Sequence, residues 1–239
     1  MNVILTGFMG TGKTAVGKRL AKRLGWRFID VDSLIETAAK MPIARIFSDR
    51  GETVFRRLEQ RAINRIIHQD QQVIATGGGA FINPQNRSRL RASGPVICLT
   101  ARPRTILTRV GHTIDARPLL HGHSDPLLRI RTLLHRRAGA YAHADVTIDT
   151  SQLAIDEVVE RIWEKLSPCM CKSWQYLLQH SGELAHRYGG KYIVVVDDRI
   201  VASGQTQLEA YQNASSRLTQ KPDAGIYYIP LTEESLTAL

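Results

Sequence analysis

The order of apolar and polar positions predicts strands that alternate with helices over the first two-thirds of the chain. Short apolar runs typical of buried strands occur at residues 3–6, 26–29, 73–75, 96–99 and 146–148. Helical spacing of apolar residues separates them, as in Val16, Leu20 and Leu24, and returns at residues 155–166. This alternation predicts an α/β fold with a parallel sheet covered by helices on both faces.

A different pattern begins after Ser167-Pro168, a dipeptide that marks a break. Helical spacing over residues 174–188 is followed by strand-like runs at 192–196 and 200–202, which flank a predicted Asp197-Asp198 turn. A helix over 208–218 and a strand at 226–229 complete a small α+β module of order α-β-β-α-β. We therefore expect two domains, residues 1–166 and residues 168–239.

Composition and charge narrow the classes of protein. The 239 residues carry a formal net charge of +10, and the charges nearly cancel from Pro168 onward, so the positive excess lies in the first domain. A basic surface attracts nucleic acid or small polyanions, but no nucleic-acid motif is recognisable, and we expect no such partner. No run has the roughly 18 apolar residues of a membrane helix. The first residues lack a basic leader, so we expect no membrane association and a cytoplasmic location.

Cysteines and histidines do not predict a zinc site. The chain has three cysteines, Cys98, Cys169 and Cys171. The first lies in an apolar run and is expected to be buried, whereas the other two could supply half of a metal site that lacks a second pair of ligands. His112, His121 and His123 share one polar stretch, where solvated histidines are common.

The segment from Gly7 to Thr14, GFMGTGKT, fits the P-loop pattern between a predicted strand and a predicted helix. Its glycines let backbone N–H groups surround phosphate oxygens, and the following helix adds its positive end. Lys13 would reach the β and γ phosphates, and the Thr14 hydroxyl would meet Mg²⁺. The alternative is a glycine-rich turn without a ligand, but the strand–helix context favours a nucleoside triphosphate site.

Asp30 and Asp32 stand two residues apart at the predicted end of a strand. In an extended chain both side chains point the same way, so one could serve a metal ion and the other a substrate hydroxyl. Such a pair, taken alone, is also common in solvated loops.

Two further features lie between residues 51 and 79. Arg56 and Glu59 share one face of a helix expected to begin near Glu52, where a carboxylate-held arginine could clamp a substrate carboxylate or merely form a surface ion pair. Gly77, Gly78 and Gly79 follow a predicted strand directly. They indicate either a flexible turn or a ligand that approaches the backbone closely.

Together these features resemble the shikimate kinase family. The order and spacing agree through the P-loop, the two aspartates, the segment Gly-Glu-x-x-Phe-Arg-x-x-Glu at 51–59 and the triple glycine. Arg117-Pro118-Leu119-Leu120 looks like the family's lid signature, and the resemblance ends near Leu166. It implies a three-layer P-loop nucleoside monophosphate kinase-like fold with a lid. It also implies ATP- and Mg²⁺-dependent phosphorylation of the 3-hydroxyl of shikimate, in aromatic amino acid biosynthesis.

The resemblance also implies roles for single residues. Lys13, Asp32 and Arg117 would be catalytic, and Thr14 and Asp30 would serve the metal. The nucleotide would be bound by Gly10, Thr11, Gly12, Lys13, Thr14, Ala15, Arg109 and Arg117, with Arg109 stacked on adenine. Shikimate would be bound by Asp32, Arg56, Gly77, Gly78, Gly79 and Arg137, with Glu59 orienting Arg56.

One departure concerns the segment before Tyr141, where the family usually has Pro-Leu and this chain has Gly139-Ala140. Because Arg136 and Arg137 are adjacent, a shift of one residue would exchange their roles. The sequence leaves this choice open.

Two other functions stay open at this point. One is another small-metabolite P-loop kinase, such as a gluconate kinase, against which Arg56, Glu59 and the triple glycine argue. The other is a sensor that binds shikimate and nucleotide without turnover. Gly111 and Gly122 flank the lid arginine and read either as hinges or as ordinary loop glycines. Residues from 168 onward resemble a small prokaryotic domain family of unknown function. We expect a monomer, with that module as the surface for any protein partner.

Overall fold

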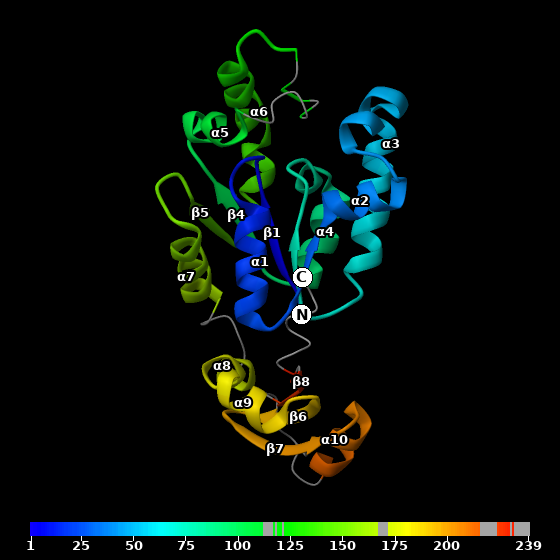
Figure 1. Ribbon diagram of the computed structural model, residues 1–239, viewed down its shortest axis with the longest axis vertical. Coiled ribbons are helices and arrows are strands. Elements are labelled where there is room, and N and C mark those ends of the chain that lie inside the picture. Colours follow the sequence, from blue (N-terminus) through cyan, green and yellow to red (C-terminus); the bar gives the residue numbers. More distant parts are fainter. Residues whose placement is uncertain are drawn as a thin grey trace. The chain divides into compact units, whose positions relative to one another are not determined.

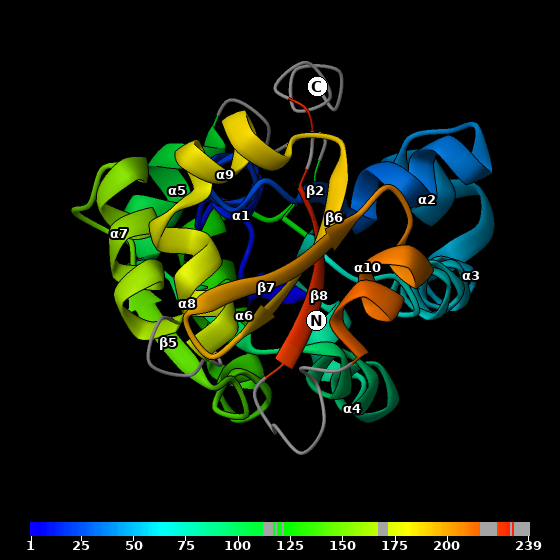
Figure 2. The same cartoon turned by 90° about the horizontal axis from the view of Figure 1, so that it is seen from below.

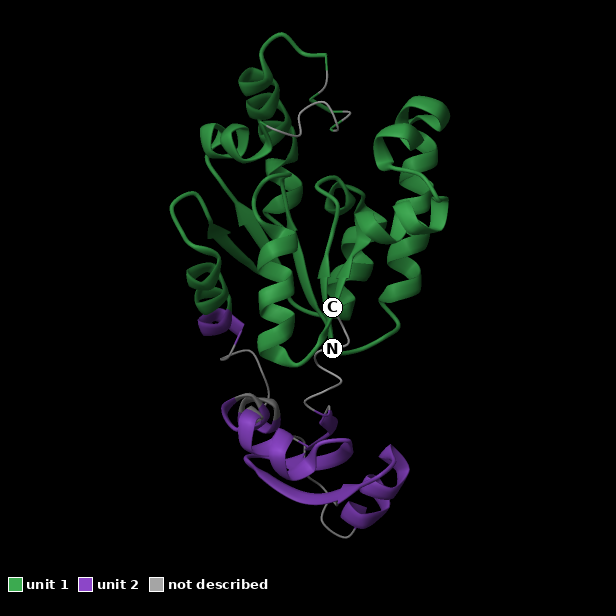
Figure 3. Cartoon of the chain, viewed as in Figure 1, with its two compact units in different colours: residues 1–162 green, residues 163–239 purple. Residues whose placement is uncertain are grey.

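The computed structural model describes residues 1–111, 117, 119–120, 122–166, 172–215, 224–229 and 231. The chain divides into two compact units, Met1–Ile162 and Trp163–Leu239 (Figure 3). The predicted features that lie outside the described residues are Pro118, His112, His121, the break at Ser167-Pro168, Cys169 and Cys171. None of the helices that the structure describes combines the length and the apolar character that crossing a bilayer requires.

The first unit is built on a five-stranded parallel sheet. Its strands are β1 (Val3–Gly7), β2 (Arg27–Asp30), β3 (Gln72–Ala75), β4 (Val96–Thr100) and β5 (Val146–Asp149), in the order β2-β3-β1-β4-β5. Every residue of β1 and β3 is buried, as expected for central strands covered on both faces. The structure thus confirms the five predicted strands and the parallel sheet.

Helices flank this sheet on both sides (Figures 1 and 2). They are α1 (Lys13–Leu24), α2 (Val31–Ala39), α3 (Ile43–Ile66), the short 3₁₀ helix η1 (Ala80–Ile82), α4 (Pro84–Ser93), α5 (Pro103–Val110), α6 (Pro126–Tyr141) and α7 (Ile155–Leu166). Helix α1 lies on one face of the sheet, and α3 and α4 lie on the other. Ion pairs of Arg19 with Asp156 and of Arg23 with Glu160 join α1 to α7. The predicted three-layer architecture is confirmed.

Two hydrophobic clusters hold the elements that carry the cavity. The larger packs the sheet against α3 and α4 and includes the fully buried Ile4, Ile46 and Leu90. The second packs Phe8, which follows β1, against Ile106 of α5 and neighbouring residues of α6. The loop after β1 is therefore anchored by its own apolar side chain.

Helix α3 differs from the sequence-based expectation. It begins at Ile43 rather than near Glu52, and Gly51 interrupts it with φ 78° and ψ 165°. A Cβ at Gly51 would meet nothing within 4 Å, so this glycine serves the backbone bend and not close packing. The predicted start corresponds to the second helical segment, and the first segment was missed.

The register of the sheet brings three strand ends together. Ala75 of β3 pairs with Leu5 of β1 on one side and with Asp30 of β2 on the other. Because parallel strands end at the same edge, the segments that follow β1, β2 and β3 all start from one place. This is where open α/β sheets bind their ligands.

The second unit has its own three-stranded antiparallel sheet. Its elements are α8 (Lys172–Gln179), α9 (Ser181–Tyr188), β6 (Lys191–Val196), β7 (Arg199–Gly204), α10 (Gln207–Ala214) and β8 (Ala224–Ile229), with strand order β7-β6-β8. The predicted hairpin is confirmed, with Asp197 at φ 55° in a two-residue turn. Val194 of β6 packs against Ala210 and Ala214 of α10.

One helix prediction for this unit is wrong. The single helix expected over residues 174–188 is two helices, because His180 adopts φ −110° and ψ 15° between them. Residues 216–218, the predicted end of the later helix, lie outside the described residues. The domain division at residues 166–168, which coincides with the end of α7, stays our proposal.

Candidate active site

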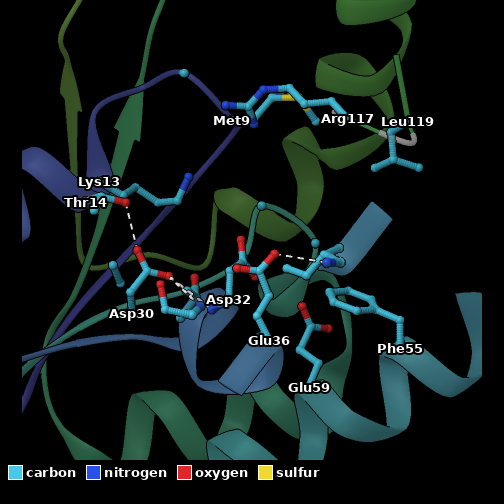
Figure 4. Close-up of a pocket in the computed structure, with 18 of the residues that line it drawn as sticks. Met9, Lys13, Thr14, Asp30, Asp32, Glu36, Phe55, Glu59, Arg117 and Leu119 are labelled. Atoms are coloured by element: carbon cyan, nitrogen blue, oxygen red, sulfur yellow. Dashed lines mark hydrogen bonds between the residues drawn. The ribbon is translucent and has the colours of Figure 1, made fainter. Parts of the chain in front are cut away.

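A cavity of about 740 Å³ lies at the carboxyl ends of β1, β2 and β3. It is lined by the loop after β1, the start of α1, the start of α2, both segments of α3 and residues 75–79. Figure 4 shows Lys13, Asp32 and Glu59 among the side chains around it. The predicted site residues that it brings together are Gly10, Gly12, Lys13, Thr14, Ala15, Asp30, Asp32, Arg56, Glu59, Gly77, Gly78, Gly79, Arg117 and Arg137. Two predicted residues, Thr11 and Arg109, are not part of this lining.

The loop after β1 depends on glycine for its backbone conformation. Gly7, Gly10 and Gly12 have φ values of 132°, 75° and 95°, which side chains disfavour. Gly12 is also the N-cap of α1, so the loop ends at the N-terminus of that helix, where the helix dipole is positive. The Thr11 hydroxyl is buried and donates to the Phe8 carbonyl oxygen at 2.7 Å, which braces the turn from inside.

Lys13 is held on the same loop. Its ammonium donates to the Phe8 carbonyl oxygen at 2.9 Å. Burial lowers the pKa of Lys13 to about 8, and the negative charges of Asp32 and Asp30 oppose that shift. The side chain is therefore charged at neutral pH but loses its proton more readily than an exposed lysine.

Asp30 ties α1 to α2. The Thr14 hydroxyl donates to Asp30 Oδ2 at 2.8 Å, while Asp30 Oδ1 accepts from the backbone N–H of Asp32 at 3.0 Å (Figure 4). Asp30 thus acts as the N-cap of α2, and the helix begins at the next residue. The expected extended chain through Asp32 is therefore wrong, although both carboxylates line the cavity.

Asp32 lies in the first turn of α2 with one oxygen unsatisfied. Its Oδ1 atom is buried, and it accepts no hydrogen bond from the described residues. Burial raises the pKa of Asp32, and the nearby charge of Asp30 raises it further. The described residues therefore leave this acceptor without a hydrogen bond, and a ligand hydroxyl could supply one.

Arg56 is fixed between two glutamates. Its guanidinium donates to Glu59 Oε2 at 3.0 Å and to Glu52 Oε1 at 2.9 Å. The Glu59 side chain is 1% exposed, so this is no surface ion pair. Burial raises the pKa of Glu59 to about 7, although the positive charge of Arg56 acts in the opposite direction. The arrangement gives the guanidinium a fixed orientation at the cavity wall.

Residues 77–79 are glycines because charged side chains fill the space beside them. A Cβ at Gly77 would lie 2.6 Å from Asp32 Oδ1, and one at Gly79 would lie 2.7 Å from both terminal nitrogens of Arg56. A Cβ at Gly78 would lie 3.3 Å from Arg137 Nη1. None of the three has a positive φ. The close approach expected here is made by the protein's own side chains.

Of the two adjacent arginines on α6, Arg137 reaches the cavity. It is 5% exposed, and its Nη1 donates to the Gly78 carbonyl oxygen at 2.8 Å. Arg136 is exposed and does not line the cavity. Arg117 also lines the cavity, and burial lowers the pKa of its guanidinium. Of the two, Arg137 is the one that lines the cavity, and its contact with the substrate stays a prediction.

Arg109 lies outside the cavity lining, beside the loop after β1 (residues 8–12), which we call the phosphate-binding loop. Its guanidinium donates to the Thr150 carbonyl oxygen at 2.6 Å, to the Thr150 hydroxyl at 2.9 Å and to the Gly10 carbonyl oxygen at 3.3 Å. These bonds hold it against the loop that follows β5. Stacking on an adenine ring stays a prediction.

Sequence reasoning missed an apolar part of the lining. Met9, Ile43, Phe47, Phe55 and Leu119 all face the cavity. The rings of the two phenylalanines lie 4.8 Å apart between centroids. Phe55 could have been found from its position directly before Arg56. Phe47 was missed because the helix was expected to begin near Glu52, after it.

Glu36 was missed as well. It lines the cavity and accepts a hydrogen bond from the backbone N–H of Ile43 at 2.9 Å. A lone glutamate within a helix gave no signal of this position, because the contact depends on the turn between α2 and α3.

Two family models match separate parts of the chain. The family model described as shikimate kinase matches residues 9–167, and a family of unknown function (DUF5678) matches residues 183–233. Shikimate kinase of Caldanaerobacter subterraneus subsp. tengcongensis is 49% identical over 161 residues, which cover 67% of this chain and 93% of that protein. The Thermus thermophilus enzyme is 44% identical over 164 residues, 69% of this chain and 89% of that protein.

Solved structures give the same picture. Shikimate kinase from Acinetobacter baumannii in complex with shikimate superposes with a TM-score of 0.66 at 36% identity, over 69% of this chain and 92% of that one. The Bacteroides thetaiotaomicron enzyme has a TM-score of 0.63 at 32% identity, over 70% and 98%. With the family match spanning most of residues 1–166 and these relatives covered almost end to end, the chain belongs to the shikimate kinase family.

Proposed function

We propose that this chain transfers the γ-phosphoryl group of ATP to the 3-hydroxyl of shikimate, which gives shikimate 3-phosphate and ADP. ATP-dependent phosphorylation of shikimate, a step of aromatic amino acid biosynthesis, is the activity of the family to which it belongs. The observation that carries the proposal is one cavity in which a phosphate-binding loop faces two fixed arginines and an unpaired carboxylate oxygen.

The residues beside the phosphate-binding loop fit a magnesium ion. Thr14 Oγ1 and Asp30 Oδ2 are hard oxygen donors 2.8 Å apart at the cavity wall. Magnesium is usually held in this way, by one or two carboxylates, a hydroxyl and the phosphates themselves. We therefore infer that Thr14 and Asp30 hold Mg²⁺, which when bound neutralises charge on the β and γ phosphates.

The nucleotide side of the site works chiefly through its backbone. The N–H groups of residues 10–15 lie at the start of α1, where they can surround the phosphates. Lys13 exchanges its bond to the Phe8 carbonyl oxygen for the β and γ phosphates. Arg109 is already fixed beside the loop, and we assign it to the adenine end.

The acid-binding side works through charged side chains. Arg56, oriented by Glu59, and Arg137 bind the shikimate carboxylate. Arg137 is suited to this role because it is buried, yet no carboxylate of the described residues lies within ion-pair distance of it. A substrate anion would compensate that charge. The backbone of residues 77–79 lines the same cavity beside these two arginines, and we assign it to the shikimate site as well.

The chemistry requires orientation and charge neutralisation more than covalent help. Asp32 Oδ1 accepts the hydrogen bond of the attacking hydroxyl, which aims that oxygen at the phosphorus atom. Its raised pKa makes it a better proton acceptor than an exposed aspartate. Lys13 and Arg117 spread the negative charge that develops on the transferred group.

An ADP-release assay with ATP, Mg²⁺ and separate additions of shikimate, quinate and gluconate tests the proposal. We expect turnover on shikimate, and a loss of about 10²-fold or more in kcat/KM in Arg56→Ala, because a charge-assisted bidentate contact is removed. Arg57→Ala is the matched control, since Arg57 is the adjacent arginine and is exposed. Turnover only on another acid would reject shikimate. Shikimate binding without ADP release would indicate a sensor.

Three lesser assignments complete the proposal. We infer a monomer, a cytoplasmic location, and a domain division at residues 166–168. The second unit carries the match to a family of unknown function and is assigned no activity. Sedimentation of the full chain checks the first point, since a dimeric mass would contradict it.

A further inference from the structure

Two side chains of α6 meet at the backbone carbonyl group of Gly78, within the segment of residues 77–79. The Gly78 carbonyl oxygen accepts from Arg137 Nη1 at 2.8 Å and from the Tyr141 hydroxyl at 2.6 Å. The two donors are four residues apart, which places them on the same face of the helix one turn apart. Both are buried, at 5% and 8% exposed. The function proposed above uses the arginine and gives the tyrosine no role.

The surroundings of Arg137 define its orientation from two sides. Its guanidinium carbon lies 5.1 Å from the centroid of the Phe8 ring, over the phosphate-binding loop. On its other side the guanidinium donates a hydrogen bond to the Gly78 carbonyl oxygen. A guanidinium has five N–H donors, so a single carbonyl leaves several for a ligand in the cavity that Arg137 lines.

That carbonyl group needs a second anchor. Gly78 stands between two glycines, and a peptide flanked by glycine has little intrinsic preference for one orientation. A Cβ at Gly78 would lie 3.4 Å from both the Gly7 oxygen and the Met9 nitrogen, so the peptide packs against the phosphate-binding loop. If it rotated, the acceptor for Arg137 would turn with it. The Tyr141 hydroxyl is the donor that opposes this rotation.

We propose that Tyr141 is a positioning residue for substrate binding: it fixes the Gly78 carbonyl group, which in turn orients Arg137 toward the substrate carboxylate. This inference rests on the proposed function, because it concerns the same acid-binding arginine. Burial raises the pKa of Tyr141 to about 12, although the positive charge of Arg137 and its hydrogen bond with the hydroxyl act in the opposite direction. The hydroxyl therefore keeps its proton over the ordinary range of pH, and its contact with Arg137 adds to the bond at Gly78.

Tyr141→Phe tests this role in the full-length protein. We expect the KM for shikimate to rise about 3- to 10-fold, the effect of one neutral hydrogen bond. We expect kcat and the KM for ATP to change less than about 2-fold, because the nucleotide side is untouched. The Gly78 oxygen keeps Arg137 as a donor, so the variant leaves no buried acceptor unpaired. Tyr211→Phe, at a tyrosine 53% exposed in the second unit, is the control for the same chemical change.

A double-mutant cycle tests whether the tyrosine acts through the arginine. Arg137→Lys keeps the charge but not the planar fork. In that background Tyr141→Phe should raise the KM for shikimate by less than about 2-fold. Multiplied effects would mean that Tyr141 acts independently of Arg137, and the inference would fail. Calorimetric titration with shikimate gives the same comparison if Arg137→Lys is too slow to assay.

The outcomes separate this inference from the proposed function. No turnover of shikimate by the unmodified chain would reject the function. Turnover by the unmodified chain with an unchanged KM in Tyr141→Phe would reject only the inference. Equal loss of ATP and shikimate binding in Tyr141→Phe would assign the tyrosine to general stability and would also overturn it.

Discussion

Two glycine-rich loops line the same cavity and use glycine for opposite reasons. In the loop after β1, Gly7, Gly10 and Gly12 lie at positive φ, so glycine supplies backbone shapes that other residues disfavour. In the loop after β3, Gly77 and Gly79 have ordinary φ values, and glycine supplies room for Asp32 and Arg56. The first loop thus requires glycine for its backbone conformation, and the second requires glycine because neighbouring side chains leave no room for a Cβ atom.

This difference matches what each loop has to recognise. Backbone N–H groups at a helix start suit phosphate groups in general, because they combine hydrogen-bond donors with the positive end of the helix dipole. A ring acid with one carboxylate and several hydroxyls needs donors and acceptors at set positions, and in the function proposed above Arg56 and Asp32 are the side chains that provide them. Changes in the first loop should therefore damage the fold and nucleotide binding, whereas changes in the second should damage acid binding alone.

The largest effect is expected from Gly7→Ala. The added Cβ would overlap the Leu99 carbonyl oxygen of the neighbouring strand, and φ 132° would be strained. Backbone cannot yield as a side chain can, so we expect a loss of at least about 3 kcal/mol in the free energy of unfolding. Urea denaturation of the variant measures it, and a loss below about 1 kcal/mol would contradict this account of the first loop.

Gly79→Ala should leave the fold intact and damage one substrate site. Its Cβ would meet the terminal nitrogens of Arg56 at 2.7 Å, the far end of a flexible side chain that can move aside. We expect the KM for shikimate to rise about tenfold or more, from the displaced charge-assisted contact. The free energy of unfolding should fall by less than the loss of about 3 kcal/mol expected for Gly7→Ala, because a side chain can yield where backbone cannot. Steady-state kinetics with each substrate varied in turn measures both KM values. A parallel rise in the KM for ATP would contradict the proposal that this loop serves acid binding alone.

The pH dependence of ATP use should report on Lys13. Its pKa of about 8 lies below the usual lysine value, so the free enzyme loses this positive charge as the pH rises through 8. We expect kcat/KM for ATP to fall about fivefold between pH 8 and pH 9, as one ionisation dictates. At saturating ATP, kcat should hold to higher pH, because bound phosphates favour the charged lysine. A kcat/KM profile that stays flat to pH 10 would contradict this expectation.

Gly139→Ala should have the smallest effect and the opposite sign. Gly139 lies within α6 without a positive φ, and an added Cβ would meet nothing within 4 Å. Alanine in a helix interior is favoured over glycine by about 0.5–1 kcal/mol, so the variant should be more stable by that amount. Denaturant titration shows the gain, and kinetics should be unchanged. Destabilisation would mean that this glycine too has a structural task.

Local patterns were enough to predict the parallel sheet and the phosphate site from sequence. Apolar runs mark the central strands because both of their faces are buried. The P-loop from Gly7 to Thr14 carries its own conformational requirements in its glycines. Helix α7 was placed correctly because its apolar residues recur with helical spacing.

Features that depend on distant contacts could not be predicted. Gly77 and Gly79 are crowded by side chains from α2 and α3, and no spacing in the sequence shows this. Arg136 and Arg137 are chemically identical, so only the packing of α6 decides which one faces the cavity. The extended chain expected at Asp32 failed because Asp30 caps a helix that starts immediately after it.

The unpaired Oδ1 atom of Asp32 has a consequence for which molecules this enzyme rejects. A ligand that brings a hydroxyl to this oxygen supplies a hydrogen bond, whereas an analogue without that hydroxyl leaves the oxygen buried and without one. Sites built to pair a substrate hydroxyl discriminate by a factor of about 10⁴–10⁵ against analogues that lack it. One extra or missing methylene in an apolar pocket gives a factor of only about 10–200. Because the hydroxyl that we assign to Asp32 is also the proposed phosphoryl acceptor, an analogue without it should bind more weakly and offers no group to phosphorylate.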